Sequence, residues 1–435
     1  MDRKYASALE HVPLYAEAVE QIVQDSSDRF SELTAQVTAP VLFSYVWNIL
    51  RQAERMGLKR LYFLSRDGYL PFEIAKEITK VCPVSVEMKY LYGSRLALRL
   101  PCVHRLDRED GMSLLLYRGS KQTLQHILNR ASITSEERRQ ICEELNFPEE
   151  FAEKKLSSRE YHEICSALRS SVRFRQASLM HSREAYTTAY RYFVQEGLTE
   201  GVPFGIVDIG WTTEIQRSLR QLLDGIPPIT GFYFGLTEVS GIADGVCNTW
   251  YFSPESNLRL QTRFSKSLFV NICNAPHSMT KGYQEKNGRF LPVLQSETET
   301  INPIFRTQME VCRKFASYCA GKIQYNRFDK NLHREMCIRL LTGLMYRPTR
   351  EEALLFSMLP CRDADSLVTE ETILREHLFF HRSLHNLRKE DRPESLPWSY
   401  GSLAVSNLPM QVLRRSALRH EETMYYLFQQ IHNKK

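Results

Sequence analysis

The first 58 residues carry apolar side chains at helical spacing. The segments LYAEAVEQIV and VLFSYVWNILRQAERMG place apolar residues three or four positions apart, which is typical of a helix with one buried face. Pro40 lies near the start of the second segment and Gly57 at its end, where proline and glycine commonly begin and end helices. We therefore predict that residues 1–58 form helices that pack on the core that follows.

A strand, helix, strand pattern comes next. In chain order its elements are RLYFL (60–64), the turn SRDG (65–68), the helical YLPFEIAKEITK (69–80) and the strand MKYLY (88–92), which closes with Gly93, Ser94 and Arg95. Because strands joined by a helix run parallel in one sheet, the pattern predicts a βαβ unit.

A second unit of the same kind follows further along the chain. Its elements are FGIVD (204–208), the turn IGWTT (209–213), EIQRSLRQLL (214–223) and ITGFYFGL (229–236). The residues from about 105 to 200 are charged and helical in pattern, with capping boxes expected at Thr134 with Glu137 and at Ser157 with Glu160. We interpret this stretch as a helical insertion.

Two such units predict an α/β fold with a Rossmann-like parallel sheet. We place the core at residues 59–300, where residues 245–295 mix short strands and loops around the two units. Residues 301–435 are expected to form a C-terminal helical region, interrupted by the polar, proline-containing stretch 389–402. No internal repeat of fixed period is present.

Composition narrows the class of protein. The 435 residues, 43% hydrophobic and 25% charged, are typical of a globular chain, and a net charge of +6 favours anionic partners without choosing among them. The N-terminus lacks an apolar signal segment, so we expect a cytoplasmic protein, with peripheral association with the inner face of the membrane left open. Ten cysteines without a C-x-x-C pair argue against a zinc ribbon, a redox motif or a disulfide framework and predict reduced, mostly buried thiols.

The turn after the strand 204–208 has the residues of an anion site. At the carboxyl end of a parallel strand, the N-terminus of the next helix points its N–H groups at a ligand. Asp208 offers a carboxylate for ribose hydroxyls or a metal-bound water. The residues that would cradle a phosphate are Gly210, Trp211, Thr212 and Thr213.

The turn after the strand 60–64 also has residues suited to an anion site at a strand end. Arg66 offers a guanidinium fork for phosphate oxygens, Asp67 a carboxylate and Gly68 close backbone approach. Ser94 and Arg95 add a second cation at the end of the neighbouring strand. Two anion sites on one sheet suit a substrate phosphorylated at two ends, and phosphoribosyl pyrophosphate is such a molecule.

These segments resemble type I phosphoribosyltransferases, and more closely a family found in bacterial surface-polysaccharide gene clusters that is often annotated near haloacid-dehalogenase hydrolases. The shared motifs read FLSRDGY (63–69), YGSR (92–95), VDIGW (207–211) and APHS (275–278). The resemblance implies transfer of 5-phosphoribofuranose from phosphoribosyl pyrophosphate to a sugar hydroxyl of a glycan, in O-antigen or capsule synthesis. It further implies a lipid-linked acceptor and a separate phosphatase that acts on the product.

The resemblance also implies roles for residues. Asp67, Asp208 and His277 would be catalytic, with Asp67 or His277 as the base, and Asp67 and Asp208 would hold Mg²⁺. The donor would be bound at its pyrophosphate by Ser65, Arg66, Gly68, Ser94 and Arg95, and at its 5-phosphate by Gly210, Trp211, Thr212 and Thr213. The chain departs from the type I pattern at Ile209, where those enzymes usually carry a second acidic residue.

Other functions stay open at this point. A haloacid-dehalogenase phosphatase would use VDIGWTT as a degenerate D-x-D-x-T motif, although Gly210 replaces its second aspartate. An actin-like sugar kinase can contain D-I-G-x-T-T, but its loop joins two strands rather than a strand and a helix. A nucleobase phosphoribosyltransferase and a non-catalytic donor-binding module are further alternatives.

Two segments of the C-terminal region invite secondary hypotheses. His377, His381 and His385 share one helix face, which allows a metal site, but no acidic or cysteine ligand stands nearby and we favour a solvated face. The basic, aromatic tail is expected to pack on the body through Met424, Leu427 and Ile431 rather than to lie on a membrane.

Overall fold

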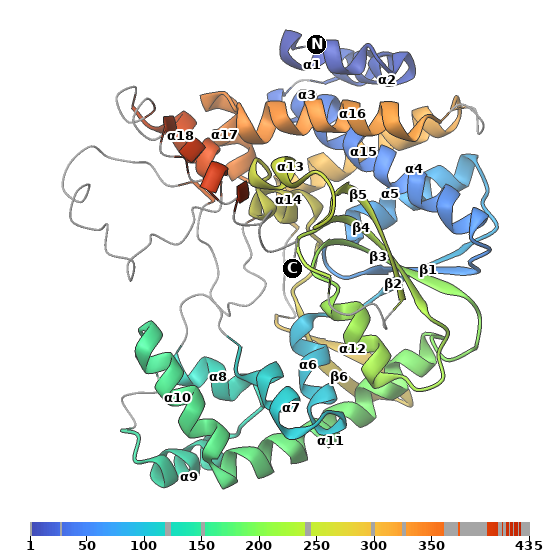
Figure 1. The fold of residues 1–435 in the computed structure, drawn as a ribbon. Coiled ribbons are helices and arrows are strands. Elements are labelled where there is room, and N and C mark those ends of the chain that lie inside the picture. The colour runs from blue at the N-terminus through green and yellow to red at the C-terminus, as the bar shows by residue number, and fades with distance from the viewer. Residues whose placement is uncertain are drawn as a thin grey trace.

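The computed structural model of the chain describes residues 2–26, 28–117, 123–148, 153–239, 245–296, 301–323, 328–360, 373–374 and 398–407, with scattered residues from 411 to 427. It is a mixed α/β structure built on a five-stranded parallel sheet with helices on both faces (Figure 1). The sheet contains β1 (Arg60–Leu64), β2 (Glu87–Leu91), β3 (Phe204–Trp211), β4 (Ile229–Leu236) and β5 (Gly245–Phe252). A separate antiparallel hairpin pairs β6 (Thr280–Lys286) with β7 (Arg289–Leu294).

The strand order β2-β1-β3-β4-β5 places a topological switch point between β1 and β3. The connection from β1 leads outward to β2 on one side, whereas β3 and the later strands follow on the other side. Ligands of open α/β sheets bind beyond the carboxyl ends of the strands at such a point. Because the two predicted turns follow β1 and β3, the fold brings them to this position.

One sheet face is covered by helices from both ends of the chain (Figure 1). The N-terminal helices are α1 (Arg3–Leu9), α2 (Pro13–Gln24), α3 (Arg29–Leu33), the π-helix η1 (Thr34–Thr38) and α4 (Ala39–Arg55). The others on this side are α5 (Tyr69–Val81), α13 (Leu258–Thr262), α14 (Lys266–Cys273), α15 (Pro303–Ala320), α16 (Lys330–Leu341), η6 (Thr342–Tyr346), α17 (Arg350–Ser357) and α18 (Ser399–Val405). Buried residues of the N-terminal helices form one hydrophobic core with those of the sheet and of the helices that follow residue 301.

The continuous helical stretch Arg29–Arg55 is long and apolar enough to cross a membrane by composition alone. The most apolar part of this stretch is wholly buried inside the protein. Its side chains contact α15 and the sheet, so it serves as the central helix of the larger core. Such burial is typical of a core helix.

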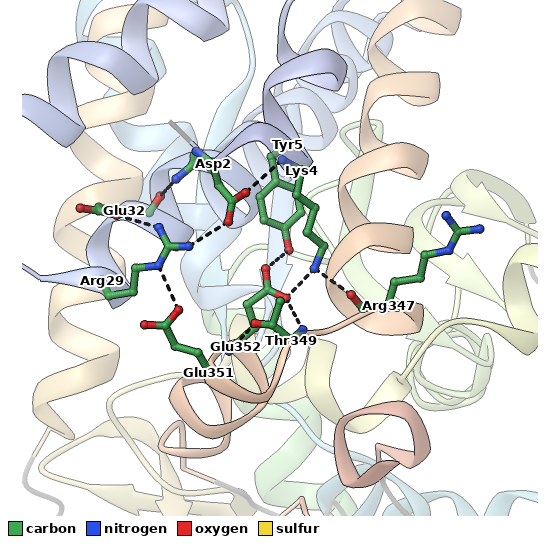
Figure 2. A network of polar contacts seen from close by, with 10 residues as sticks. Asp2, Lys4, Tyr5, Arg29, Glu32, Arg347, Thr349, Glu351 and Glu352 are labelled. Carbon is green, nitrogen blue, oxygen red and sulfur yellow. Dashed lines mark hydrogen bonds and ion pairs between the residues drawn. The ribbon is translucent and has the colours of Figure 1, made fainter. Parts of the chain in front are cut away.

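A polar network ties the N-terminal helices to α17 (Figure 2). Its centre is Glu352, which is fully buried and accepts hydrogen bonds from Lys4 Nζ at 2.5 Å, Tyr5 Oη at 2.6 Å and Thr349 N at 2.7 Å. Burial lowers the pKa of Lys4, and the Glu352 carboxylate opposes this effect. This buried carboxylate therefore fixes α1 against the start of α17.

The other sheet face is covered by α6 (Arg95–Cys102), α11 (Val172–Gln195) and α12 (Glu214–Leu222). The remaining helices of the insertion are η2 (Val103–Arg105), α7 (Arg108–Leu115), α8 (Leu124–Arg130), α9 (Ser135–Leu145) and α10 (Ser158–Ser170), which form a separate small core with the first half of α11. Both predicted capping boxes are present, at the starts of α9 and α10. The second half of α11 packs on the sheet, so α11 joins the small core to the sheet at one end of the insertion, as α6 does at the other.

Several boundaries differ from the sequence predictions. The strand β3 continues to Trp211, three residues beyond the predicted end, because Gly210 and Trp211 pair with Gly235 and Leu236 of β4. The region 245–295 contains a full sheet strand and two helices that the pattern did not reveal. The helix α18 begins inside the stretch 389–402 that we predicted to be irregular.

The C-terminal predictions have mixed outcomes. Met424 and Leu427 are exposed, so the prediction that they pack on the body is wrong for these two. Ile431 and the three histidines His377, His381 and His385 lie outside the described residues. Nine cysteines are described; all carry free thiols and most are buried, as predicted.

Candidate functional site

The turn after β1 is locked to the end of β2. The hydroxyl of Ser65 donates to the carbonyl oxygen of Gly93 at 2.9 Å and accepts from the Gly93 N–H at 3.0 Å. The Ser65 N–H donates to Leu91 O at 2.9 Å. Ser65, predicted to bind the donor, is thus buried and uses its hydroxyl to hold two strand ends together.

Gly68 begins α5 and has no room for a side chain. A Cβ atom at this position would lie 2.5 Å from the carbonyl oxygen of Leu64. The absence of a side chain therefore lets the helix start directly over the strand end, which keeps Arg66 and Asp67 at the sheet edge. The Ser65–Arg66 peptide bond in this turn is cis.

The end of β3 is built differently from the phosphate-cradling turn that we predicted. Gly210 has φ +119°, and a Cβ there would lie 1.9 Å from Gly235 O, so the two strands approach too closely for any side chain. The Trp211 ring stacks on Phe252 at 5.9 Å between centroids and packs against the larger core. Gly210 and Trp211 are therefore strand residues, and the prediction that they belong to the turn is wrong.

The turn itself is reduced to two threonines before α12. Thr213 is buried, with 1% of its surface exposed, whereas Thr212 is partly exposed. Arg99 of α6 forms an ion pair with Glu214, the first residue of α12, in which Arg99 Nη2 donates to Glu214 Oε2 at 2.9 Å. This ion pair connects the helices that begin beyond β2 and β3.

Asp67 and Asp208 come together at the switch point although they are far apart in the sequence. Asp208 is 7% exposed and Asp67 is partly buried. Burial, reinforced by the neighbouring charge of Asp67, raises the pKa of Asp208 to about 8, against hydrogen bonds from the N–H groups of Ile209 and Gly210. Burial also raises the pKa of Asp67, which the positive charges of Arg66 and Arg95 oppose. The two carboxyl groups therefore titrate as a coupled pair, and burial favours the protonated form of each.

This donor set suits a magnesium–phosphate complex. Two carboxylates are the usual protein contribution to Mg²⁺ where substrate phosphates complete the coordination shell. In the described part of the chain no group of three or more His, Cys, Asp or Glu side chains is placed to hold a metal on its own. Asp67 and Asp208, which we predicted as metal ligands, would therefore be the protein's share of a Mg²⁺ site that phosphate oxygens complete.

His277, the third predicted catalytic residue, lies within a group of tyrosines, one of which, Tyr90, is close enough to Asp67 for its charge to act. Its Nδ1 is 2.9 Å from the carbonyl oxygen of Ser278, and its Nε2 is 2.7 Å from the hydroxyl of Tyr90. A carbonyl oxygen only accepts, so in the neutral ring Nδ1 carries the proton and Nε2 accepts from Tyr90. Burial raises the pKa of Tyr90 well above its usual value, and the Asp67 charge adds to this effect.

The tyrosines around His277 present partly exposed rings. The Tyr92 ring lies 5.0 Å and the Tyr69 ring 6.3 Å from the imidazole, measured between centroids. Both rings are partly exposed. The sequence analysis did not single out these residues. Tyr90 and Tyr92 are two positions apart in MKYLY, and residues at this spacing in an extended segment share one face.

Ser94 and Arg95 open α6 beside the β2 end. The Ser94 hydroxyl accepts from Ala97 N at 3.0 Å as the helix cap and donates to Thr280 O at 2.6 Å. It therefore serves to place α6 and β6 rather than to present a hydroxyl. Arg95 is the first residue of the helix and its charge acts on both carboxylates.

A further residue that the sequence analysis missed is Lys266, the first residue of α14. Its ammonium lies 6.0 Å from the centre of the Trp211 ring, at the end of β3. The charges that act on the carboxylate pair are those of Arg66 and Arg95, whereas Lys266 lies beside the Trp211 ring in the larger core. No protein-family model matches this chain, and no curated protein sequence matches it.

Proposed function

We propose that the protein is a phosphoribosyltransferase-like glycosyltransferase that moves 5-phosphoribofuranose from phosphoribosyl pyrophosphate to a sugar hydroxyl of a glycan. The observation that carries the proposal is the meeting of two carboxylates and two guanidinium groups at the β1/β3 switch point. A Rossmann-like phosphoribosyltransferase core at residues 59–300 accounts for the parallel sheet and its ligand position. The glycan would belong to a bacterial surface polysaccharide, and the enzyme would work in the cytoplasm.

The donor is bound with its pyrophosphate toward the β1 and β2 ends. Arg66 and Arg95 face this region and supply bidentate donors for phosphate oxygens. Asp208 lies next to them and is available to the ribose hydroxyls. Bound Mg²⁺, held by oxygens of Asp67 and Asp208 and of the donor, would neutralise charge that develops on the leaving pyrophosphate.

The reaction substitutes one oxygen for another at the anomeric carbon. The oxygen of the acceptor hydroxyl forms the new bond to C1, the C1–O bond to pyrophosphate breaks, and pyrophosphate leaves with the electron pair. The donor has the α configuration, so attack from the opposite face gives a β-ribofuranoside. The proton of the acceptor hydroxyl passes to a base of this chain.

Two groups are candidates for that base. Asp67 lies within the carboxylate pair, and His277 lies behind the hydroxyl of Tyr90. A proton that reaches His277 would pass through Tyr90, whose own proton moves to Nε2. The partly exposed rings of Tyr69 and Tyr92 then provide apolar surface against which an acceptor sugar can lie.

The direct test uses the purified full chain with phosphoribosyl pyrophosphate, Mg²⁺ and a panel of synthetic and lipid-linked glycan acceptors. Mass spectrometry should detect acceptors that carry one added phosphoribosyl unit, together with free pyrophosphate. A separate phosphatase would remove the 5-phosphate afterwards, so the primary product keeps it. Absence of both the adduct and donor binding would refute the proposal. Release of inorganic phosphate from sugar phosphates would favour the phosphatase alternative instead.

The base is assigned by comparing Asp67→Asn with His277→Ala. Removal of a positioned base lowers turnover by about 100- to 10,000-fold. Arg66→Lys serves as a matched comparison, since it weakens bidentate phosphate binding and should raise the KM for the donor while proton transfer stays intact. If Asp67→Asn and His277→Ala both keep near wild-type turnover, neither residue is the base.

A further inference from the structure

Tyr69 places a partly exposed aromatic ring two residues beyond Asp67 of the carboxylate pair. It is the first residue of α5, the helix that follows β1, so its side chain starts at the edge of the sheet where substrates bind. The ring packs on the larger core and still keeps part of its surface in contact with solvent. Tyr69 is therefore available to a substrate that reaches Asp67.

The neighbours of Tyr69 fix the direction of its ring. Tyr90 lies 5.5 Å away and His277 6.3 Å away between ring centroids, and both rings stand nearly perpendicular to that of Tyr69, at 83° and 87°. Tyr90 and His277 are joined by a hydrogen bond of 2.7 Å. Among the residues that the structure describes, no ring stacks flat on Tyr69. A face of the ring is thus held in place without being covered by a second aromatic ring.

An ion pair lies one helical turn beyond Tyr69. Glu73 follows it by four residues and so lies on the same face of α5. This carboxylate is 4% exposed and pairs with Arg313 of α15 and with Lys76. Arg313 keeps 35% of its side chain exposed. Burial raises the pKa of Tyr69, and the charges of Glu73 and Arg313 act on it in opposite directions, which places the ion pair beside the ring.

This combination of groups suits a neutral sugar. A pyranose presents C–H bonds on its faces and hydroxyl groups around its rim. An aromatic ring offers apolar surface to the face, and a guanidinium offers several N–H donors to hydroxyl oxygens. Glu73 holds Arg313 in place, so less side-chain freedom is lost when a ligand binds. Glu73 also neutralises Arg313, which favours a hydroxyl over a phosphate at this position.

We propose that Tyr69 and Arg313 bind the acceptor sugar, with the Tyr69 ring against one face of the sugar and Arg313 on a hydroxyl at its far rim. The inference rests on the proposed function and names the residues that recognise the acceptor. Asp67, Tyr69 and Glu73 follow one another at the start of α5. The rise of one helical turn, about 5.4 Å, is close to the width of a pyranose ring. A sugar held in this way has its near rim at Asp67, where the reacting hydroxyl is required.

The test measures binding of simple sugars to the full chain. The probes are the methyl glycosides of glucose, galactose, mannose and N-acetylglucosamine, and saturation-transfer difference NMR measures their affinities. At least one of them should bind the wild type, and Tyr69→Ala should weaken its binding by about 10-fold or more, because an aromatic anchor is removed. Tyr69→Phe should keep the affinity, since the ring face is retained. Tyr190→Ala is the matched control, because Tyr190 is a partly exposed tyrosine of α11 that stacks on Tyr186, and it should change nothing.

Arg313→Met should weaken binding of the same glycoside by about 10-fold, because donors to a hydroxyl are lost. Glu73 keeps Lys76 as a partner in this variant, and the Tm shows whether the fold is retained. Arg313→Lys should recover part of the affinity. Calorimetric titration with phosphoribosyl pyrophosphate and Mg²⁺ should give the wild-type donor affinity for Tyr69→Ala and Arg313→Met, since neither residue contacts the donor in this arrangement.

A wild type that binds the donor but none of the glycosides would overturn the inference, and so would an unchanged glycoside affinity in Tyr69→Ala. An equal loss of glycoside and donor affinity in Tyr69→Ala would also overturn it, because the substitution would then disturb the whole site. These outcomes leave the proposed function standing. A wild type that binds no phosphoribosyl pyrophosphate would instead refute the proposed function, and the inference with it.

Discussion

The carboxylate pair at the switch point should make folding stability depend on pH in a direction opposite to that of an ordinary aspartate. The pKa of Asp208 is raised from 3.8 to about 8, chiefly by burial and then by Asp67. The native state therefore binds this proton more tightly than the unfolded state does. Its contribution to stability is fully present below about pH 4 and is lost as the pH rises through about 8.

The replacement Asp208→Asn isolates this contribution, since asparagine resembles the protonated acid and does not ionise. The free energy of unfolding of the variant minus that of the wild type should increase by up to about 1.4 kcal/mol per pH unit between pH 4 and 8. The sum over this window is at most about 6 kcal/mol. Contributions from groups that do not interact with Asp208 are common to both proteins and cancel, whereas Asp67, whose charge acts on Asp208, titrates differently in the variant.

Urea unfolding at intervals from about pH 4.5 to about pH 8.5 measures this difference in the free energy of unfolding. These limits cover the pH range in which the ionisation of Asp208 affects stability. Asp224→Asn is the matched control, because Asp224 is exposed and its ion pair with Arg105 lies at the surface. This control should give a difference that stays flat with pH. A flat difference for Asp208→Asn as well would show that Asp208 does not hold a proton in the folded protein.

Three further outcomes follow from the geometry. Binding of phosphoribosyl pyrophosphate with Mg²⁺ at about pH 7 should release protons, because metal ligands must be deprotonated. Titration calorimetry in buffers of different ionisation enthalpy detects this release, and binding heats that do not depend on the buffer would contradict it. Glu352→Ala should lower the free energy of unfolding by about 3 kcal/mol, because buried donors lose their acceptor. Replacement of the exposed Glu351 by alanine should change it by less than about 1 kcal/mol, and equal effects of the two variants in urea unfolding would show that the hydrogen bonds to Glu352 do not stabilise the fold. Gly210→Ala should fail to yield folded protein, whereas Gly282→Ala, which has open space around its Cβ position, should fold normally. Circular dichroism measures the folding of both variants, and normal folding of Gly210→Ala would show that β3 and β4 can separate.

Local patterns were sufficient to predict the elements of the two βαβ units. The strand ITGFYFGL was predicted with the bounds that the structure gives to β4, and both capping boxes in the insertion are confirmed. These features depend on side chains close in sequence, which is why alternation and helix-start residues reveal them. The order of the strands depends on pairings between distant segments, so the switch point between β1 and β3 became visible only in the folded chain.

The error at the end of β3 has a specific physical cause. Gly210 and Trp211 read as turn residues, because glycine is common in phosphate-binding turns. In the folded protein Gly210 lies against Gly235 of β4, and the absence of both side chains lets the two strands continue side by side. A glycine that permits close backbone approach and a glycine that permits a turn look identical in a single sequence.

Lys266 shows a different limit of sequence reasoning. It stands in a segment that was predicted only as mixed strands and loops, so the sequence pattern did not place it beside the end of β3. Its interest comes from what surrounds it in space, namely burial beside Trp211 without an ion-pairing carboxylate in the described structure. Such an environment has no signature in the residues that precede and follow a lysine.

The second acidic residue of type I enzymes has no place at position 209 of this chain. Ile209 is fully buried in the larger core, and alternation along β3 directs its side chain away from that of Asp208. Asp67 instead supplies the second carboxylate from the end of β1. Ile209→Asp should therefore restore the sequence pattern but not the site: an unpaired carboxylate in the core should lower the free energy of unfolding by more than about 3 kcal/mol.

Ile209→Val is the matched control and should cost about 1 kcal/mol, because it removes one buried methyl group. Urea unfolding measures stability, and calorimetry measures donor affinity in any Ile209→Asp protein that folds. The opposite outcome would be an Ile209→Asp protein that is as stable as Ile209→Val and binds the magnesium–donor complex more tightly than the wild type does. The new carboxylate would then reach the metal, and the assignment of the second carboxylate to Asp67 would be wrong. The expected result leaves the two carboxylates at the ends of β1 and β3, so that the proposed donor site depends on the pairing of those two strands.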